Sequence, residues 1–154
     1  MFSPLRGLLL FLAGGAFPLC SQVVPSQANM DAQAQRRIQA NAQESFRRQR
    51  INDNIAHLVP SLDPAGLTGP KAPVLTRQAM AALADLSSDG IPPNEALQRA
   101  IKASNLDTPV TQKTSAYLLG CWADLAGQIT PEDIEAMKKG NAPKTPWEMR
   151  PYQP

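Results

Sequence analysis

Few residues of this chain could carry out chemistry. The sequence contains one histidine, His57, and two cysteines, Cys20 and Cys121. A nucleophilic Cys–His pair would need Cys121 and His57 to meet, and a reactive thiol needs an electropositive, partly open setting. Cys121 instead falls on an apolar stripe beside Trp122. The pattern favours a buried thiol and an ordinary histidine at a helix end over a catalytic pair.

The sequence also lacks the usual motifs for metals and cofactors. One histidine and two cysteines cannot build a Cys or His metal cluster. The acidic residues Glu132, Asp133 and Glu135 fit the first turn of a helix, where the helix dipole favours negative charge. No CxxCH, GxGxxG, P-loop or GxSxG sequence is present. We therefore predict a protein that is not an enzyme and that holds neither a cofactor nor a metal ion.

A cluster of arginines raises the question of nucleic-acid binding. It consists of Arg36, Arg37, Arg47, Arg48 and Arg50. On a helix these side chains spread around the cylinder, and Glu44 and Asp53 dilute their charge, which favours a solvated or partner-facing helix. The formal net charge of the chain is only +2 at pH 7, so no general field attracts nucleic acid or an anionic membrane. We expect no nucleic-acid partner.

The N-terminus has the pattern of an export signal. Arg6 precedes an apolar run that ends near Cys20 and is too short and too rich in glycine to span a bilayer comfortably. The small residues Ser26 and Ala28 stand at the −3 and −1 positions of a cleavage site after Ala28. We predict a cleaved signal peptide over residues 1–28 and a periplasmic product, peripheral to the inner membrane.

Three alternatives to this cleavage stay open. Cleavage after Ala16 would leave the apolar sequence FPLC at the new terminus. The segment could instead remain as an N-terminal membrane anchor or a buried helix. Lipidation of Cys20 is the third alternative, although the preceding Leu19 is larger than a lipidation site prefers. Cleavage after Ala28 would leave Cys121 as the single cysteine, which excludes an internal disulfide in that product.

A long polar helix is predicted over residues 29–59. Residues 30–58 contain no Gly or Pro and are rich in Ala, Gln and Arg, which are good helix formers. The apolar residues at i, i+4 spacing are Ala34, Ile38, Ala42 and Phe46. They form only a thin stripe, so we expect the helix to lie along a partner or to wrap around the rest of the chain.

The rest of the chain is predicted to be a linker followed by a small helical domain. Residues 60–73 contain four prolines and two glycines and are expected to form a linker or a long irregular loop. Residues 74–141 are expected to form about four short helices, of which Thr108 and Thr130 cap the last two. The residues that mark helix starts or stops are Gly90, Pro93, Pro109, Pro131 and Gly140. Since no alternating run is long enough for a strand, the predicted fold class is all-α.

Residues 142–154 are predicted to be an extended tail, because closely spaced prolines forbid a helix. Trp and Tyr often anchor interfaces, and this tail contains Trp147 and Tyr152. The tail could dock on a partner or fold back over the small core of its own domain, and we favour a partner. The predicted partner-binding residues are Trp147, Met149, Tyr152, Ile38 and Phe46.

Four features bear on the family of this protein: the N-terminal LRGLLLFLAGGAF, a processed length near 126 residues, the lack of a cofactor motif, and the C-terminal NAPKTPWEMRPYQP. In outline they resemble the small third subunit of the membrane-bound quinoprotein alcohol dehydrogenases of acetic acid bacteria. In that family the large subunit carries pyrroloquinoline quinone and haem, and a cytochrome subunit passes electrons to ubiquinone. The resemblance implies a cofactor-free accessory subunit that supports assembly or stability of a larger exported protein and meets the membrane only through it.

Two other classes of function stay open. The chain could be a free-standing periplasmic helical binding protein for a small molecule or peptide, with a cleft lined by Tyr117, Trp122 and their neighbours. It could also be an enzyme of an unfamiliar type that uses Cys121.

Overall fold

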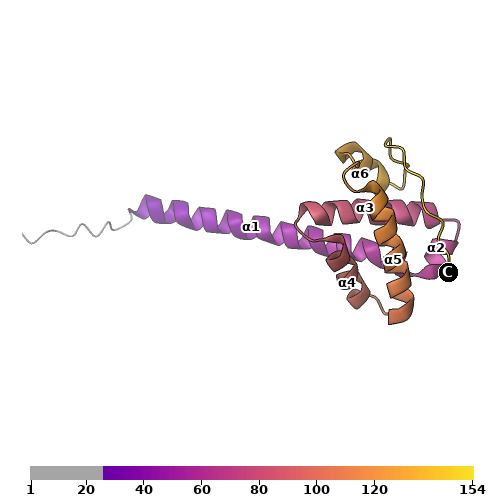
Figure 1. Ribbon diagram of the computed structural model, residues 1–154. Helices are drawn as coiled ribbons and strands as arrows, with labels where there is room; N and C mark the ends of the chain where they lie inside the picture. The colour runs from indigo at the N-terminus through magenta and orange to yellow at the C-terminus, as the bar shows by residue number, and fades with distance from the viewer. Residues whose placement is uncertain (1–25) are drawn as a thin grey trace, which may run out of the picture. The chain divides into compact units, whose positions relative to one another are not determined.

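The computed structural model describes residues 26–154, and over this range the regular secondary structure is all helix, with no strand (Figure 1). The all-α fold class is therefore confirmed, with a long N-terminal helix followed by several shorter ones. The elements are α1 (Gln27–Leu58), a 3-10 turn η1 (Val59–Leu62), α2 (Pro64–Thr68), α3 (Ala72–Ser88), α4 (Pro93–Ala103), α5 (Thr108–Leu125) and α6 (Pro131–Lys138). Residues 1–25 of the predicted signal peptide lie outside the described range, so the signal peptide stays a prediction.

The chain divides within α1 into two units, Met1–Asn41 and Ala42–Pro154. In the described part of the first unit every side chain is exposed, including that of Ile38. In the second unit α1 enters the core with Ile55 and Leu58, which are buried. The first part of α1 therefore depends on local helix propensity and the last turns depend on packing.

The core of the second unit is organised around α3, which contacts α2, α4, α5 and α6. Leu83 of α3 is fully buried, and it belongs to one apolar cluster with Leu97 of α4, Leu118 of α5 and Met137 of α6. Alanines fill several positions of α3 inside this cluster. Their small size lets neighbouring helices approach closely, which explains how one helix can contact so many others.

Residues 60–73, which the sequence predicts to be a linker or an irregular loop, are partly helical in the structure, and they are docked on the domain. Asp63 caps α2, since its Oδ1 accepts a hydrogen bond of 2.9 Å from the backbone N–H of Ala65. Leu62 is fully buried, and its carbonyl oxygen accepts a 3.0 Å hydrogen bond from the hydroxyl of Thr114. Pro60, Pro64 and Pro73 are tolerated because they occupy the first turns of η1, α2 and α3, where a backbone N–H is not needed, and Pro70 lies in the turn between α2 and α3.

The predicted helix starts are correct for α6 and wrong for α5. Thr130 caps α6 as predicted: its hydroxyl accepts from the backbone N–H of Asp133, and the Asp133 carboxylate accepts from the backbone N–H of Thr130. In α5 the N-cap is Asp107, and Thr108 is the first helical residue rather than the cap. The reason is that proline fits either of the first two helical positions, so Pro109 did not fix the start to one residue.

Two glycines at helix ends have positive φ and offer a matched test of packing. A Cβ at Gly140 (φ +81°) would lie 2.8 Å from Val74 Cγ1, whereas a Cβ at Gly90 (φ +86°) would meet nothing within 4 Å. We expect Gly90→Ala to cost about 1–2 kcal/mol of unfolding free energy, from backbone strain alone. Gly140→Ala should cost more, because Val74 must also move. Urea unfolding of the two variants measures the difference, and equal losses would show that the contact with Val74 has no energetic weight.

Candidate functional site

The C-terminal tail, residues 142–154, lies against its own domain. No helix or strand occurs in these residues, and residues 143, 145, 147 and 149 are half-buried while those between them are exposed. The hydroxyl of Tyr117 donates a 2.7 Å hydrogen bond to the carbonyl oxygen of Arg150, and the rings of Tyr117 and Tyr152 meet edge to face at 5.1 Å. Arg150 also donates two hydrogen bonds, of 2.6 and 2.8 Å, to the carboxylate of Asp124. One side of the tail is thereby held on α5.

Asp133 holds the other end of the tail. This side chain is almost fully buried, and its Oδ1 accepts a 2.7 Å hydrogen bond from the backbone N–H of Lys144. Its Oδ2 accepts a 2.5 Å hydrogen bond from the hydroxyl of Thr145. These donors, the Thr145 hydroxyl first and then the backbone N–H groups of Thr130 and Lys144, outweigh burial and hold the pKa of Asp133 well below its ordinary value.

The predicted partner-binding residues fall into two groups. Trp147, Met149 and Tyr152 are half-buried along their own domain, and Trp147 packs against its core. Ile38 and Phe46 on α1 are 68% and 72% exposed. In the structure the tail therefore folds back over its own domain, which is one of the two positions that the sequence left open. Binding of a partner by any of the five residues stays a prediction.

Trp147 has an unusual feature in this position. Its indole nitrogen Nε1 is buried, and it makes no hydrogen bond to any group within residues 26–154. A buried donor without an acceptor carries an unrecovered desolvation cost. The tail is therefore held on the domain at Asp133 and Arg150, but one buried hydrogen-bond donor between these two points, Trp147 Nε1, has no acceptor within residues 26–154.

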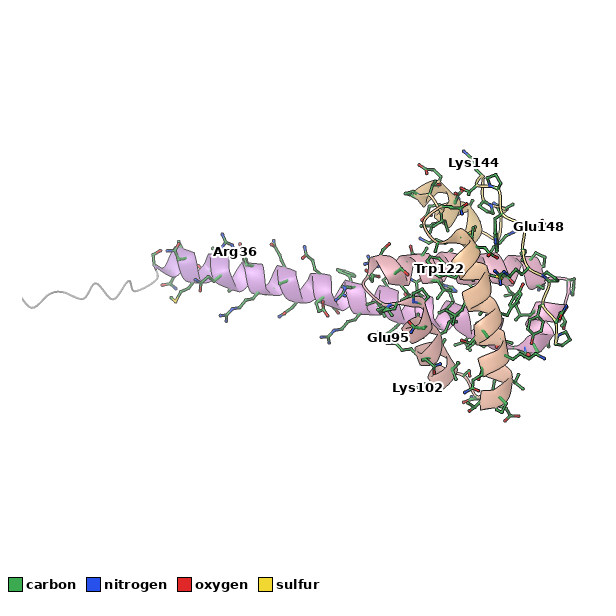
Figure 2. The ribbon with its side chains drawn as sticks, in the orientation of Figure 1. Arg36, Glu95, Lys102, Trp122, Lys144 and Glu148 are labelled. Carbon is green, nitrogen blue, oxygen red and sulfur yellow. The ribbon has the colours of Figure 1, made fainter. Side chains whose placement is uncertain are left out.

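Cys121 is completely buried on α5, as the sequence indicated. Burial raises the pKa of its thiol, which disfavours the thiolate that nucleophilic chemistry requires. Burial likewise raises the pKa of the neighbouring Tyr117 to about 12. The cleft expected at Tyr117 and Trp122 is filled at Tyr117 by the tail, and Trp122 is half-buried on α5 against the core (Figure 2).

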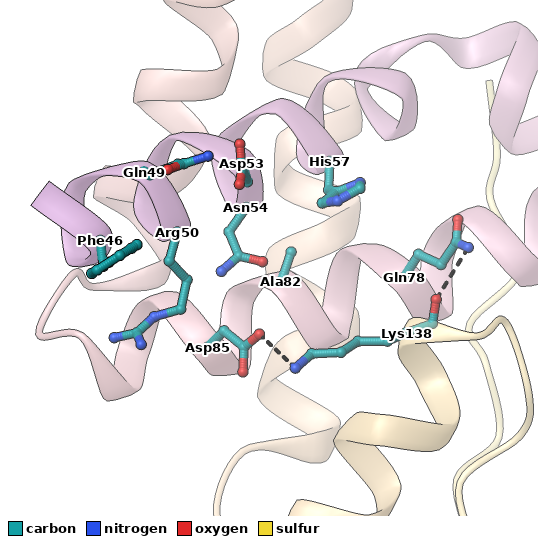
Figure 3. A pocket seen from close by; sticks show the side chains of 10 residues that line it. All are labelled: Phe46, Gln49, Arg50, Asp53, Asn54, His57, Gln78, Ala82, Asp85 and Lys138. Atoms are coloured by element: carbon teal, nitrogen blue, oxygen red, sulfur yellow. Dashed lines mark hydrogen bonds and ion pairs between the residues drawn. The ribbon is translucent and has the colours of Figure 1, made fainter.

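A second candidate site was missed by the sequence reasoning. It is a hollow of about 580 Å³, formed by α1, α3 and the end of α6 and called here the α1–α3 hollow (Figure 3). Its wall includes Phe46, Asp53, Asn54, His57, Ala82 and Asp85. One signal could have found it: Asn54 stands at i+3 from Ile51 and four residues before Leu58, so a polar amide interrupts the apolar face of α1.

Comparisons of this chain with models of protein families, with characterised proteins and with solved structures found no match. None of the helices within residues 26–154 has the length and apolar character needed to cross a membrane. In the same range no three His, Cys, Asp or Glu side chains are grouped in a way that could hold a metal ion.

Deletion of residues 144–154 should expose Cys121 to thiol reagents. Arg150 contributes to the surroundings of the thiol and lies over Gly120, where a Cβ would be 3.0 Å from its guanidinium. We expect the truncated chain to react with a disulfide reagent at least about tenfold faster than the full chain, because less of the structure must open. Glu148→Gln, at an exposed tail position, serves as the control. Equal rates in the truncated and full chains would show that the tail does not protect the thiol.

Asp133 should also make stability depend on pH. Because its pKa is lowered in the folded state, its contribution is present at neutral pH and is lost as the pH falls below the ordinary carboxyl value of about 3.9. Asp133→Asn should be less stable than the unmodified chain near pH 6 but should lose less stability between about pH 6 and about pH 3. Urea midpoints at the two pH values test this, and parallel losses in both chains would contradict it.

Proposed function

We propose that this protein is a non-catalytic accessory subunit that binds a larger exported protein and stabilises or matures it. The observation that carries this proposal is the exposure of large apolar side chains on α1: Phe46 (72%), Ile38 (68%) and Met30 (48%). Single exposed apolar residues are ordinary on protein surfaces. Here, however, they lie on a helix whose remaining exposed residues are polar or alanine. A partner that covers them would give the helix the apolar contacts it lacks.

The tail supports the same proposal in a different way. Trp147, Met149 and Tyr152 are half-buried, so each still presents surface to a partner while the tail stays on its domain. The unpaired indole N–H of Trp147 favours a rearrangement in which it reaches an acceptor on the partner. Ile38 and Phe46 are therefore the primary contacts in this proposal, and the tail residues are secondary ones.

The family resemblance supplies the candidate partner, a quinoprotein alcohol dehydrogenase that feeds electrons to ubiquinone. In this proposal the chain is exported through its N-terminal signal, works in the periplasm without a cofactor of its own, and reaches the inner membrane only through the dehydrogenase. The nearly balanced charge of the chain, +2, supports an attachment that does not depend on anionic lipid.

Single charge insertions on α1 test the proposal. Ile38→Asp and Phe46→Asp should each reduce the amount of the larger protein that co-purifies with the chain from the native membrane fraction by more than about tenfold, because a charge is buried in an apolar contact. Gln35→Asp and Gln43→Asp make the same charge change at exposed polar positions of the same helix and should retain the partner. All four variants should keep the unfolding free energy within about 0.5 kcal/mol, since the sites are exposed.

Two results would count against an accessory subunit. One is recovery of the larger protein with Ile38→Asp and Phe46→Asp at the level of the two controls. The other is sedimentation of the native protein as a small particle without a partner. The second result would favour the alternative, a free-standing periplasmic binding protein for a small molecule or peptide, for which the α1–α3 hollow offers a more open site than Tyr117 and Trp122.

A further inference from the structure

The wall of the α1–α3 hollow contains a buried polar group without a partner. The side chain of Asn54 is only 8% exposed and points from α1 toward α3, between Arg50 and Ala82 (Figure 3). Its amide makes no hydrogen bond to another group in the described part of the chain. The amide therefore keeps its hydrogen-bonding capacity for a group that enters the hollow.

The two cations of the hollow are already neutralised. Lys138 Nζ lies 3.0 Å from an Asp85 carboxylate oxygen and 2.8 Å from one of Glu135. Arg50 pairs with Asp89, with Nε 3.0 Å from Oδ2. Three carboxylates thus face two cations in these pairs, so the wall offers an anionic ligand no free positive charge.

Asp53 adds a further carboxylate to the same wall and forms no ion pair within residues 26–154. Beyond the rim, Arg47 donates to the backbone carbonyl of Asp89 and pairs with Glu44, so its charge is also engaged. The unpaired charge of the hollow is therefore negative, and Asp53, which carries it, is the sequence neighbour of Asn54 in the same wall (Figure 3).

Apolar surface completes the site. The ring of Phe46 lies at one end of the hollow, and the methyl group of Ala82 lies on its α3 side (Figure 3). A volume of about 580 Å³ is within the range of pockets that hold small molecules. The combination of one free carboxylate, one free amide and a short apolar wall matches an ammonium group on an aliphatic stem.

We propose that the α1–α3 hollow binds a small organic cation, a primary ammonium on a short aliphatic stem. The ammonium donates hydrogen bonds to the carboxylate of Asp53 and to Oδ1 of Asn54, and the stem packs on Ala82 and Phe46. This binding site shares Phe46 with the surface proposed above for a partner, but it does not require a larger partner.

Three probes of equal length test the proposal: n-butylammonium, n-butanol and butyrate, each titrated into the full-length protein at constant ionic strength. The readout is the backbone amide resonances in a proton–nitrogen correlation spectrum. We expect n-butylammonium to shift the resonances of α1 residues 49–57 and α3 residues 78–85. The neutral and anionic probes should bind at least about fivefold more weakly, because a hydrogen bond to a charged group is stronger than a neutral one.

Variants locate the binding groups. Asp53→Asn keeps the shape of an exposed side chain and should weaken n-butylammonium at least about fivefold, and Asn54→Leu, which fills the same space without an amide, should weaken it as well. Asp31→Asn removes an exposed carboxylate elsewhere on α1 and should have no effect. The proposal is overturned if no lining resonance shifts, if n-butanol or butyrate binds as well as n-butylammonium, or if Asp53→Asn binds the cation unchanged. Because Asp53 is exposed, this last variant remains informative even if Asn54→Leu fails to fold.

Discussion

The carboxylate of Asp133 joins two parts of the fold, the start of α6 and the beginning of the tail. It accepts hydrogen bonds from Thr130, Lys144 and Thr145 at once. The other end of α6 is fixed by α3, because Arg77 donates to the carbonyl of Gly140. With both ends of α6 fixed, the tail leaves in one direction, and that direction brings its last residues to α5. Asp133 and Arg77 thus set the direction in which the tail leaves α6, and α5 holds its last residues.

The apolar side chains that this arrangement leaves exposed are unevenly distributed. Around α3 and α5 most large apolar side chains are covered, either by helices or by Trp147, and the exceptions, Val74 and Val110, are 38% exposed. On α1 the opposite holds, since Ile38 and Phe46 are exposed on a helix that supplies little apolar surface of its own. A small core cannot cover both regions. The aromatic residues of the tail pack on the domain, whereas the apolar side chains of α1 stay exposed. A partner would therefore bury the most apolar surface on α1.

Local signals predicted the parts of this fold that depend on local chemistry. Thr130, Pro131 and Gly140 mark the ends of α6 because a cap, a fixed φ and a left-handed turn act within a few residues. The docking of residues 60–73 could not be read in the same way, since the burial of Leu62 and Leu67 is decided by α3 and α5. The position of the tail was open for a similar reason: the residues that hold it, Asp124 and Asp133, read as ordinary helix acids in the sequence.

The two candidate sites show how burial changes the chemical meaning of a residue type. Cys121 is the most reactive residue type in the described chain, yet burial keeps its thiol protonated and the tail lies across its neighbours. Asn54 is chemically inert, yet its amide has no hydrogen-bond partner within residues 26–154 and faces the hollow, so it can receive a ligand group. Ile55 and Leu58 beside it already serve the core, so this amide is left to meet a group that enters the hollow, as the proposed binding site requires.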